Sequence, residues 1–350
     1  TVLRRVTGVD KGGVVRFKLE KMRRFFSRRP ALRAAALLLG GGSAGALVLR
    51  LLLLAWRRWR CAMRLRNRCV FITGAGAGLG RGLAAGAAAR GATTLILCDV
   101  NAIALAETRA ALLATAAEDV RSLSVHTYAC DVSSDAAVEA MAKSIVSTLP
   151  PIDVLINNAG VVNGKPLLEL TDCDVTRTLR VNCASNFNVH RHLLPSLVAR
   201  NAGYVVTIAS MMGVVAAAKL SDYCASKSAQ IAMHNVLRLE MRRAAPNLRM
   251  LLVNPWSIDT GMFAGVATSK TNVRVRIANA IAPMLRPDDV IRRTLDGVEA
   301  GESLLVMPGV LRWLPHAIKL LLPPELDDAL LDYMGGIDAM DTFTGHRAES

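Results

Sequence analysis

From Cys69 onward, short apolar runs alternate with longer segments in which apolar and polar residues mix at helical spacing. The runs are rich in Val, Ile and Leu and too short for helices, so they predict strands. The expected strands lie at 69–73, 92–100, 122–132, 152–160, 203–210, 248–255 and 303–308. The expected helices lie at 81–91, 101–117, 134–149, 172–198 and 222–243. Alternating strands and helices predict a parallel, doubly wound α/β sheet, and uniformly apolar strands suit a sheet covered on both faces.

The N-terminal part of the chain follows a different pattern. Residues 34–56 form a nearly uncharged, apolar stretch that only Arg50 interrupts, and basic sequences flank it on both sides. A membrane-spanning helix needs about 20 mostly apolar residues, a length that this stretch reaches if the Arg50 side chain snorkels. Basic flanks favour anionic lipid head groups but leave the orientation open. We therefore expect a basic segment (1–33), a membrane anchor or interfacial hairpin (34–56) and a basic linker (57–68).

Two targeting signals are alternatives to an anchor in residues 34–56. A cleaved secretory signal fits poorly, because the apolar run starts deep in the chain and lacks a convincing small-residue cleavage site. An arginine-rich, acid-poor mitochondrial presequence is the other alternative.

Charge is concentrated in the same N-terminal part. Residues 1–68 hold 18 of the 43 Lys and Arg residues but only 2 of the 28 Asp and Glu residues, so the body is close to neutral despite the formal net charge of +15. The overall charge therefore does not indicate nucleic-acid binding. The seven cysteines are scattered and show no metal-ligand spacing, which indicates reduced thiols in a reducing compartment and no metal site.

The first expected strand runs directly into a glycine-rich turn, GAGAGLG at Gly74–Gly80, and then into an alanine-rich helix. This context is typical of a dinucleotide site, where glycines let a pyrophosphate approach the backbone at a helix N-terminus. A flexible linker is the alternative interpretation. The next strand ends at Asp99, whose carboxylate can bind the adenosine ribose hydroxyls and repels a 2′-phosphate, which favours NAD over NADP. Alternatively, Asp99 caps the following helix, or Arg81 meets a 2′-phosphate.

Several motifs follow in one order along the chain. They are TGAGAGLG (Thr73–Gly80), Asp99, CDV with Asp131, NNAG (Asn157–Gly160), VN with Asn182, Ser210, YCASK (Tyr223–Lys227) and NPWSIDTGM (Asn254–Met262). Over about residues 66–265 the chain resembles the short-chain dehydrogenase/reductase family. The C-terminal sequence LLPPELDDALLDYMGGIDAMDTFTGHR resembles the tail of the branch that holds membrane-bound retinol dehydrogenases and 17-beta-hydroxysteroid dehydrogenases types 11 and 13. The resemblance implies a single Rossmann-type domain, 69–309, with an apolar extension at 310–350.

The resemblance implies hydride transfer between a nicotinamide cofactor and an alcohol carbon. Tyr223 and Lys227 lie four positions apart on one helix face, and a neighbouring ammonium lowers the pKa of a phenol, so Tyr223 would handle the alcohol proton. Lys227 would also hold the nicotinamide ribose. Ser210 would bind the substrate oxygen, and Asn182 would hold a water that links Lys227 to solvent.

Further residues at family positions are expected to contact the cofactor. With Tyr223 and Lys227 they are Thr73, Gly74, Gly78, Leu79, Gly80, Asp99, Asp131, Val132, Asn158, Ala159, Gly160, Pro255 and Thr260. The family's usual glycine after Pro255 is Trp256 in this chain, which would narrow the pocket.

The expected substrate is lipophilic, because an apolar anchor precedes the catalytic motifs. We expect a membrane-associated oxidoreductase that moves a hydride between NAD and a retinoid, steroid or long-chain alcohol. The alternatives are an NADPH-dependent carbonyl reductase and a catalytically idle membrane scaffold on the same fold. The resemblance also implies the endoplasmic reticulum or a lipid droplet, with the catalytic domain facing the cytosol and the mitochondrion as the alternative.

Three further expectations concern assembly and the C-terminal third. The resemblance implies a homodimer or homotetramer through the long helices that begin near Asp172 and Asp222. Residues 262–285 would form the substrate-side segment. Residues 310–326 are strongly apolar, and we expect them to form either a core helix or a membrane-facing patch.

Overall fold

A computed structural model describes residues 63–117, 123–263 and 282–323, together with residues 325, 326, 329, 332, 340 and 343. The expected basic segment and membrane anchor lie outside the described residues, as does most of the expected substrate-side segment. Within the described part of the chain, no helix combines the length and the apolar character needed to cross a membrane.

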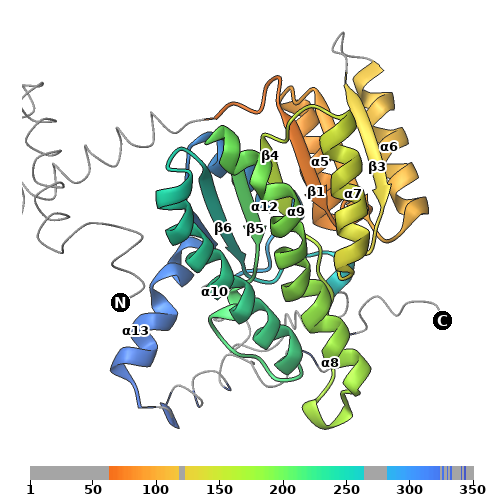
Figure 1. Ribbon diagram of the computed structural model, residues 1–350. Coiled ribbons are helices and arrows are strands. Elements are labelled where there is room, and N and C mark those ends of the chain that lie inside the picture. Colours follow the sequence, from red (N-terminus) through yellow and green to blue (C-terminus); the bar gives the residue numbers. More distant parts are fainter. Residues whose placement is uncertain are drawn as a thin grey trace, which may run out of the picture. The chain divides into compact units, whose positions relative to one another are not determined.

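The described strands form one parallel sheet in the order β3-β2-β1-β4-β5-β6-β7 (Figure 1). They are β1 (Cys69–Thr73), β2 (Thr94–Asp99), β3 (Ser124–Ala129), β4 (Val154–Asn157), β5 (Tyr204–Ile208), β6 (Arg249–Pro255) and β7 (Leu304–Met307). The chain runs outward from β1 to β3 and then crosses to β4 on the other side of β1. Open α/β sheets bind ligands beyond the carboxyl ends of the strands at such a switch point. The expected Rossmann-type fold is confirmed.

Helices cover both faces of this sheet. The α-helices of the described residues are α5 (Gly78–Ala89), α6 (Ala102–Ala117), α7 (Asp135–Thr148), α8 (Asp172–Leu179), α9 (Ser185–Arg200), α10 (Ser221–Ala244), α12 (Pro287–Glu299) and α13 (Leu314–Leu321). Helices α5, α6 and α12 lie on one face, and α7, α9 and α10 lie on the other (Figure 1).

The strands are apolar at successive positions because both of their faces are buried. In β1 the side chains of Val70 and Ile72 enter the core beneath α5, and Phe71 between them enters the opposite core beneath α7 and α9. All five residues of β1 and all five of β5 are buried. The edge strand β3 has neighbours on one side only, and most of its residues are at least partly exposed.

The expected helix at 172–198 contains an irregularity that the sequence did not predict. Between α8 and α9 lies a π-helical turn, η2 (Arg180–Ala184), with Asn182 buried inside it. The Asn182 side chain accepts a hydrogen bond from the Val161 amide at 2.7 Å and donates to the Val161 carbonyl at 2.9 Å. It also donates to the Ser226 hydroxyl at 2.9 Å. The widened turn therefore joins this long helix to the loop after β4 and to α10, as π-turns at functional sites often do.

Candidate active site

A cleft opens at the carboxyl ends of the strands, at the switch point of the sheet. It consists of a hollow of about 260 Å³ beside β5 and α10 and a hollow of about 670 Å³ beside β2 and α8. Both hollows are lined by Gly74, Asp99, Ala159 and Gly160, so they adjoin one another. The smaller one also contains the expected Gly78, Leu79, Asn158, Ser210, Tyr223, Lys227, Pro255 and Thr260. The larger one contains the expected Asp131 and Val132.

The glycine turn brings β1, α5 and the end of β4 into close contact. Gly74 has a φ of +65°, and a Cβ at Gly80 would lie 1.9 Å from the Gly74 carbonyl oxygen. Thr73 lies behind the cleft wall, where its hydroxyl accepts hydrogen bonds from the amides of Asn158 and Ala159, each at 3.0 Å. These contacts leave no room for side chains between the turn and the helix.

The N-terminus of α5 fits the pyrophosphate of a dinucleotide. Gly78 begins the helix and lines the cleft, and Ala77 before it provides no side-chain cap. The first turn of α5 carries no acidic residue. Its backbone N–H groups are therefore available to an anion, and the helix dipole favours negative charge at this end.

Asp99 is held at the rim of the cleft by backbone donors. Its carboxylate accepts hydrogen bonds from the amides of Gly76 at 2.9 Å and Asn101 at 3.0 Å. The cap of α6 is instead Asn101, whose side-chain oxygen accepts from the Ala104 amide at 3.0 Å. The helix-capping alternative for Asp99 is therefore wrong, and its carboxylate lines the cleft.

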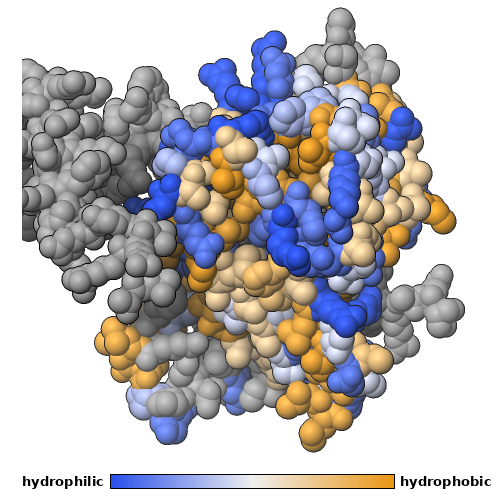
Figure 2. All heavy atoms as spheres, viewed as in Figure 1, coloured by the Kyte–Doolittle hydropathy of each residue, from blue (hydrophilic) through white to orange (hydrophobic). Residues whose placement is uncertain are grey.

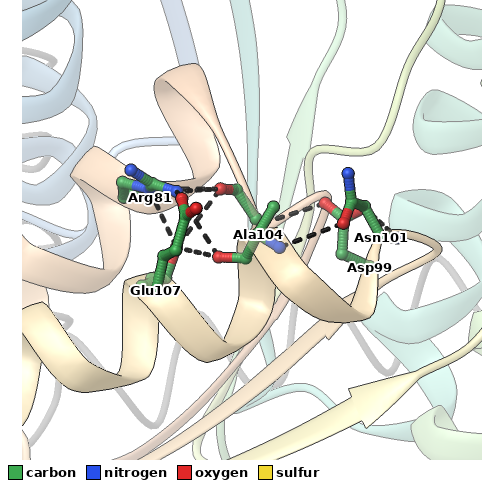
Figure 3. Close-up of polar contacts among 7 residues, drawn as sticks. Arg81, Asp99, Asn101, Ala104 and Glu107 are labelled. Carbon is green, nitrogen blue, oxygen red and sulfur yellow. Dashed lines mark hydrogen bonds and ion pairs between the residues drawn. The ribbon is translucent and has the colours of Figure 1, made fainter.

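Arg81 is bound away from Asp99. Its guanidinium donates to the Gly76 carbonyl at 2.7 Å and the Thr108 hydroxyl at 2.8 Å, and it pairs with Glu107 at 3.1 Å. Figure 3 shows Arg81 and Asp99 on opposite sides of Ala104. In this arrangement the Arg81 side chain connects the glycine turn to α6 through hydrogen bonds and an ion pair.

Tyr223, Lys227 and Ser210 meet in the smaller hollow, and each is at most 6% exposed. The Lys227 ammonium lies 5.7 Å from the centre of the Tyr223 ring. Ser210 hydrogen-bonds to Tyr223, and the Ser210 hydroxyl accepts from the Met212 amide at 3.1 Å. The expected trio is thus brought together from the end of β5 and the first turns of α10.

Burial has the largest effect on the pKa values of Tyr223 and Lys227. It lowers the pKa of Lys227 to about 8 and raises the pKa of Tyr223 above its ordinary value, although the hydrogen bond from Ser210 acts in the opposite direction. A phenol kept protonated at neutral pH can donate a proton. It becomes a base when a nearby positive charge favours the phenolate.

Asn182 and Lys227 both lie next to Gly160, which lines the cleft. A Cβ at Gly160 would lie 3.4 Å from the Asn182 side-chain oxygen and 3.6 Å from the Lys227 nitrogen. Lys227 itself donates to the Ile208 carbonyl and to the Gln230 side-chain oxygen, each at 3.1 Å. Sequence reasoning missed both partners. The only signal for Gln230 is a polar residue three positions after Lys227 on the same helix face.

An apolar cluster packs around Tyr223 next to the cleft. Met212, Leu220 and Tyr223 form a buried cluster with Met340, which lies more than a hundred residues further along the chain. Trp256 and Phe343 pack against this cluster. Trp256 also lines the smaller hollow, as expected for a bulky residue in place of glycine.

Residues 68–271 match the short chain dehydrogenase family. The chain belongs to this family. Retinol dehydrogenase 10-B of Danio rerio is 34% identical over 297 residues, covering 81% of this chain and 86% of the relative. Epidermal retinol dehydrogenase 2 of Mus musculus is 32% identical over 282 residues (80% and 86%), and retinol dehydrogenase 10 of Homo sapiens is 31% identical over 299 residues (80% and 85%).

Solved structures share the fold. A 7 alpha-hydroxysteroid dehydrogenase complexed with NADH and 7-oxo glycochenodeoxycholic acid has a TM-score of 0.61 at 24% identity, covering 71% of this chain and 96% of that one. A metagenomic short-chain oxidoreductase in complex with NADP has a TM-score of 0.56 at 22% identity, covering 70% and 97%. This chain is therefore a short-chain oxidoreductase related to the retinol dehydrogenases, with NAD(P)-dependent alcohol dehydrogenase activity.

Proposed function

We propose that the protein is a membrane-associated dehydrogenase that uses NAD to oxidise a lipophilic alcohol. The observation that carries this proposal is the apolar cluster of Met212, Leu220, Trp256, Met340 and Phe343 packed with Tyr223, because Trp256 and Tyr223 of this cluster also line the smaller hollow. The hydrocarbon part of an alcohol whose hydroxyl reaches Tyr223 would lie near Trp256, where burial of apolar surface favours binding by roughly 25 cal/mol per Å². Retinol dehydrogenases among the relatives act on an alcohol of this class by name.

In this proposal each member of the trio has one role. Tyr223, as the phenolate, takes the alcohol proton, and the Ser210 hydroxyl donates a hydrogen bond to the substrate oxygen as negative charge develops there. Lys227 provides the positive charge that favours the phenolate. A dinucleotide held in the cleft would supply the hydride acceptor for the alcohol carbon. Asn182 holds the backbone of Val161, next to Gly160, by two hydrogen bonds, and its expected role in holding a water that links Lys227 to solvent stays a prediction.

The preference for NAD is supported by the positions of two charged side chains. Asp99 presents a carboxylate where the adenosine ribose would lie, and that charge repels a 2′-phosphate. Arg81, which could neutralise such a phosphate, is bound to Gly76, Thr108 and Glu107. Glycines and apolar residues of the turn and of β4 would hold the rest of the dinucleotide, with Asp131 and Val132 beside the adenine.

The substitution Asp99→Asn tests this preference. It removes the charge and keeps an acceptor oxygen for one of the two neighbouring amides, so we expect KM for NAD to rise about tenfold and the NADP/NAD ratio of kcat/KM to increase. Glu107→Gln is the matched control, because it removes a charge beside Arg81 without touching Asp99. A wild type that already prefers NADP would contradict the proposed cofactor.

Membrane association is supported by α13 in addition to the apolar N-terminal sequence. Trp313, Leu320 and Leu321 are between 71% and 85% exposed on or next to this helix, and the Arg312 guanidinium lies 5.4 Å from the centre of the Trp313 ring. Figure 2 shows apolar atoms gathered at the lower left, where α13 lies. Exposed apolar clusters rimmed by basic groups are typical of lipid contact. We propose the endoplasmic reticulum or a lipid droplet as the location.

Self-association through α9 and α10 is also part of the proposal. Phe187 on α9 and Val236 and Leu239 on α10 are at least half exposed. Their burial in a second copy would remove apolar surface from water, and light scattering of the detergent-solubilised chain would detect the dimer or tetramer.

The deciding experiment is a cofactor-linked assay of membrane fractions with a panel of alcohols. We expect NADH formation with retinoid, steroid or long-chain alcohols and little with sugars. Tyr223→Phe is the control for background reductases. Rapid turnover of polar alcohols without turnover of any lipophilic one would contradict the proposal.

A further inference from the structure

Gln230 lies beneath the catalytic lysine with its side chain fully buried. Its Oε1 atom accepts a hydrogen bond from the Lys227 ammonium at 3.1 Å. The second acceptor for that ammonium is the carbonyl of Ile208 at the end of β5, also at 3.1 Å. A buried ammonium stays charged only where acceptors replace its water, so these two oxygens bear directly on the charge of Lys227.

Gln230 is itself fixed in one orientation. Its Nε2 donates to the side-chain oxygen of Asn186 at 3.3 Å, and the Asn186 amide donates to the carbonyl of Asn182 at 2.8 Å. Since an ammonium can only donate, the oxygen of the Gln230 amide must face Lys227. A buried chain of hydrogen bonds therefore runs from Lys227 through Gln230 and Asn186 to the π-helical turn.

We propose that Gln230 is a positioning residue that keeps the Lys227 ammonium charged and aimed at Tyr223 and the cofactor. This inference rests on the proposed function of Tyr223 and Lys227. Gln230 does not line the cleft, so it acts through Lys227 rather than on the substrate. Among the described residues, Ile208 and Gln230 take two of the three ammonium donors, which leaves one for the cleft.

The neutrality of the amide is essential to this role. A carboxylate at the same position would also bind the ammonium, but its negative charge would offset the field that favours the Tyr223 phenolate. An amide oxygen stabilises the ammonium and leaves its net charge to act on Tyr223.

The ionisation of Lys227 can be followed in a pH titration, because the buried histidines of α9 and α10 do not titrate in the same range. Burial lowers the pKa of Lys227 to about 8, within the range of an ordinary assay. The titratable groups on the elements packed around it include Asp222, Tyr223, Cys224 and His234 of α10, His190 of α9, and Asp99, which lines the same hollow as Lys227. Burial lowers the pKa of His190 to about 4 and of His234 to about 3, so both are neutral above pH 6.

Substitution of Gln230 should move the alkaline limb of the pH profile of kcat/KM for NAD-dependent alcohol oxidation. Gln230→Met removes the acceptor at similar volume, which favours the neutral amine, so the limb moves down by about one pH unit. Gln230→Glu adds a negative charge beside the ammonium, so the limb moves up. His234→Gln is the matched control, because His234 is equally buried on the next turn and bonds to Thr207. It should lower thermal stability and leave the limb in place.

A second readout separates this inference from the proposed function. NADH fluorescence titrations from pH 6 to 10 report cofactor binding, which weakens as Lys227 loses its charge. We expect Gln230→Met to shift this titration down by the same pH interval as the kinetic limb. Failure of the wild type to oxidise any lipophilic alcohol would overturn the proposed function but not this shift.

The role of Gln230 would be overturned if, in Gln230→Met, both the pH dependence of NADH binding and the alkaline limb of kcat/KM stay at their wild-type pH. A variant that is merely slower at all pH values would therefore contradict the proposal. If Gln230→Met does not fold, Gln230→Glu decides the question, because an unmoved limb in that variant contradicts the proposal equally.

Discussion

At the scale of single residues, burial decides the chemistry of the candidate site. Tyr223 and Lys227 are both 4% exposed, and burial favours the neutral form of each. The trio therefore depends on specific contacts: the hydrogen bond from Ser210 opposes the effect of burial on Tyr223, and the oxygens of Ile208 and Gln230 stabilise the Lys227 ammonium. Removing one polar atom in such a site has a large effect because no water replaces it.

The residue-scale prediction concerns the phenolic oxygen. Tyr223→Phe removes the proton acceptor and leaves the ring in its apolar cluster, so kcat should fall by about 10² to 10⁴-fold. NADH affinity and thermal stability should change little, and fluorescence titration and thermal melts would check both. A variant that retains most of its activity would show that Tyr223 does not handle the alcohol proton.

At the scale of elements, the contact between α5 and the glycine turn positions the whole dinucleotide site. The turn, the start of α5 and the end of β4 leave no space for a methyl group at Gly80. Arg81, one residue further on, holds the same turn against α6. The π-helical turn performs the equivalent task on the other side of the cleft, through Asn182 and Val161.

The element-scale prediction is made for Gly80→Ala. Its new Cβ would lie 1.9 Å from the Gly74 carbonyl, so α5 must move away from the turn. We expect destabilisation of about 1 to 3 kcal/mol and NADH affinity reduced more than tenfold, measured by denaturant unfolding and fluorescence titration.

Gly86→Ala is the control for Gly80→Ala in the same helix. Its Cβ would meet the Leu295 side chain at 2.7 Å, and a side chain can move where a backbone carbonyl cannot. Stability should therefore fall while NADH affinity is kept. Equal loss of affinity in both variants would contradict this account of the turn.

At the scale of the whole molecule, two packed layers of helices bury polar groups together with the core. His190 and His234 lie between the sheet and α9 and α10, bonded to Asn157 and Thr207. Burial lowers the pKa of His190 to about 4 and of His234 to about 3, below the ordinary value near 6.5. The folded protein therefore binds fewer protons than the unfolded chain over this range, and its stability rises with pH.

The whole-molecule prediction is a loss of stability in mild acid. As pH falls from about 6.5 toward 4, the unfolded chain gains protons at both histidines first, so the free energy of unfolding decreases. At pH 5 each histidine lowers it by about 2 kcal/mol relative to pH 7.5. Urea unfolding at both pH values would measure the loss, and His234→Gln should reduce it by about half. An equal loss in wild type and variant would contradict the prediction.

The sequence by itself determined what depends on neighbours along the chain. Apolar runs predicted the strands, the strand–glycine–helix order predicted the dinucleotide turn, and Tyr223 and Lys227 share one helix face because of their spacing. The family followed from these local motifs. Each of these features lies within one element or between consecutive elements, where backbone geometry alone sets which residues meet.

Only the tertiary structure decided the contacts between residues far apart in the sequence. It showed that a π-helical turn holds Asn182 against Val161, and that Met340 reaches the cluster around Tyr223. It also placed the Gln230 amide, held by Asn186 of another helix, against the Lys227 ammonium. Such contacts depend on how helices pack on the sheet, and many packings satisfy one pattern of apolar positions.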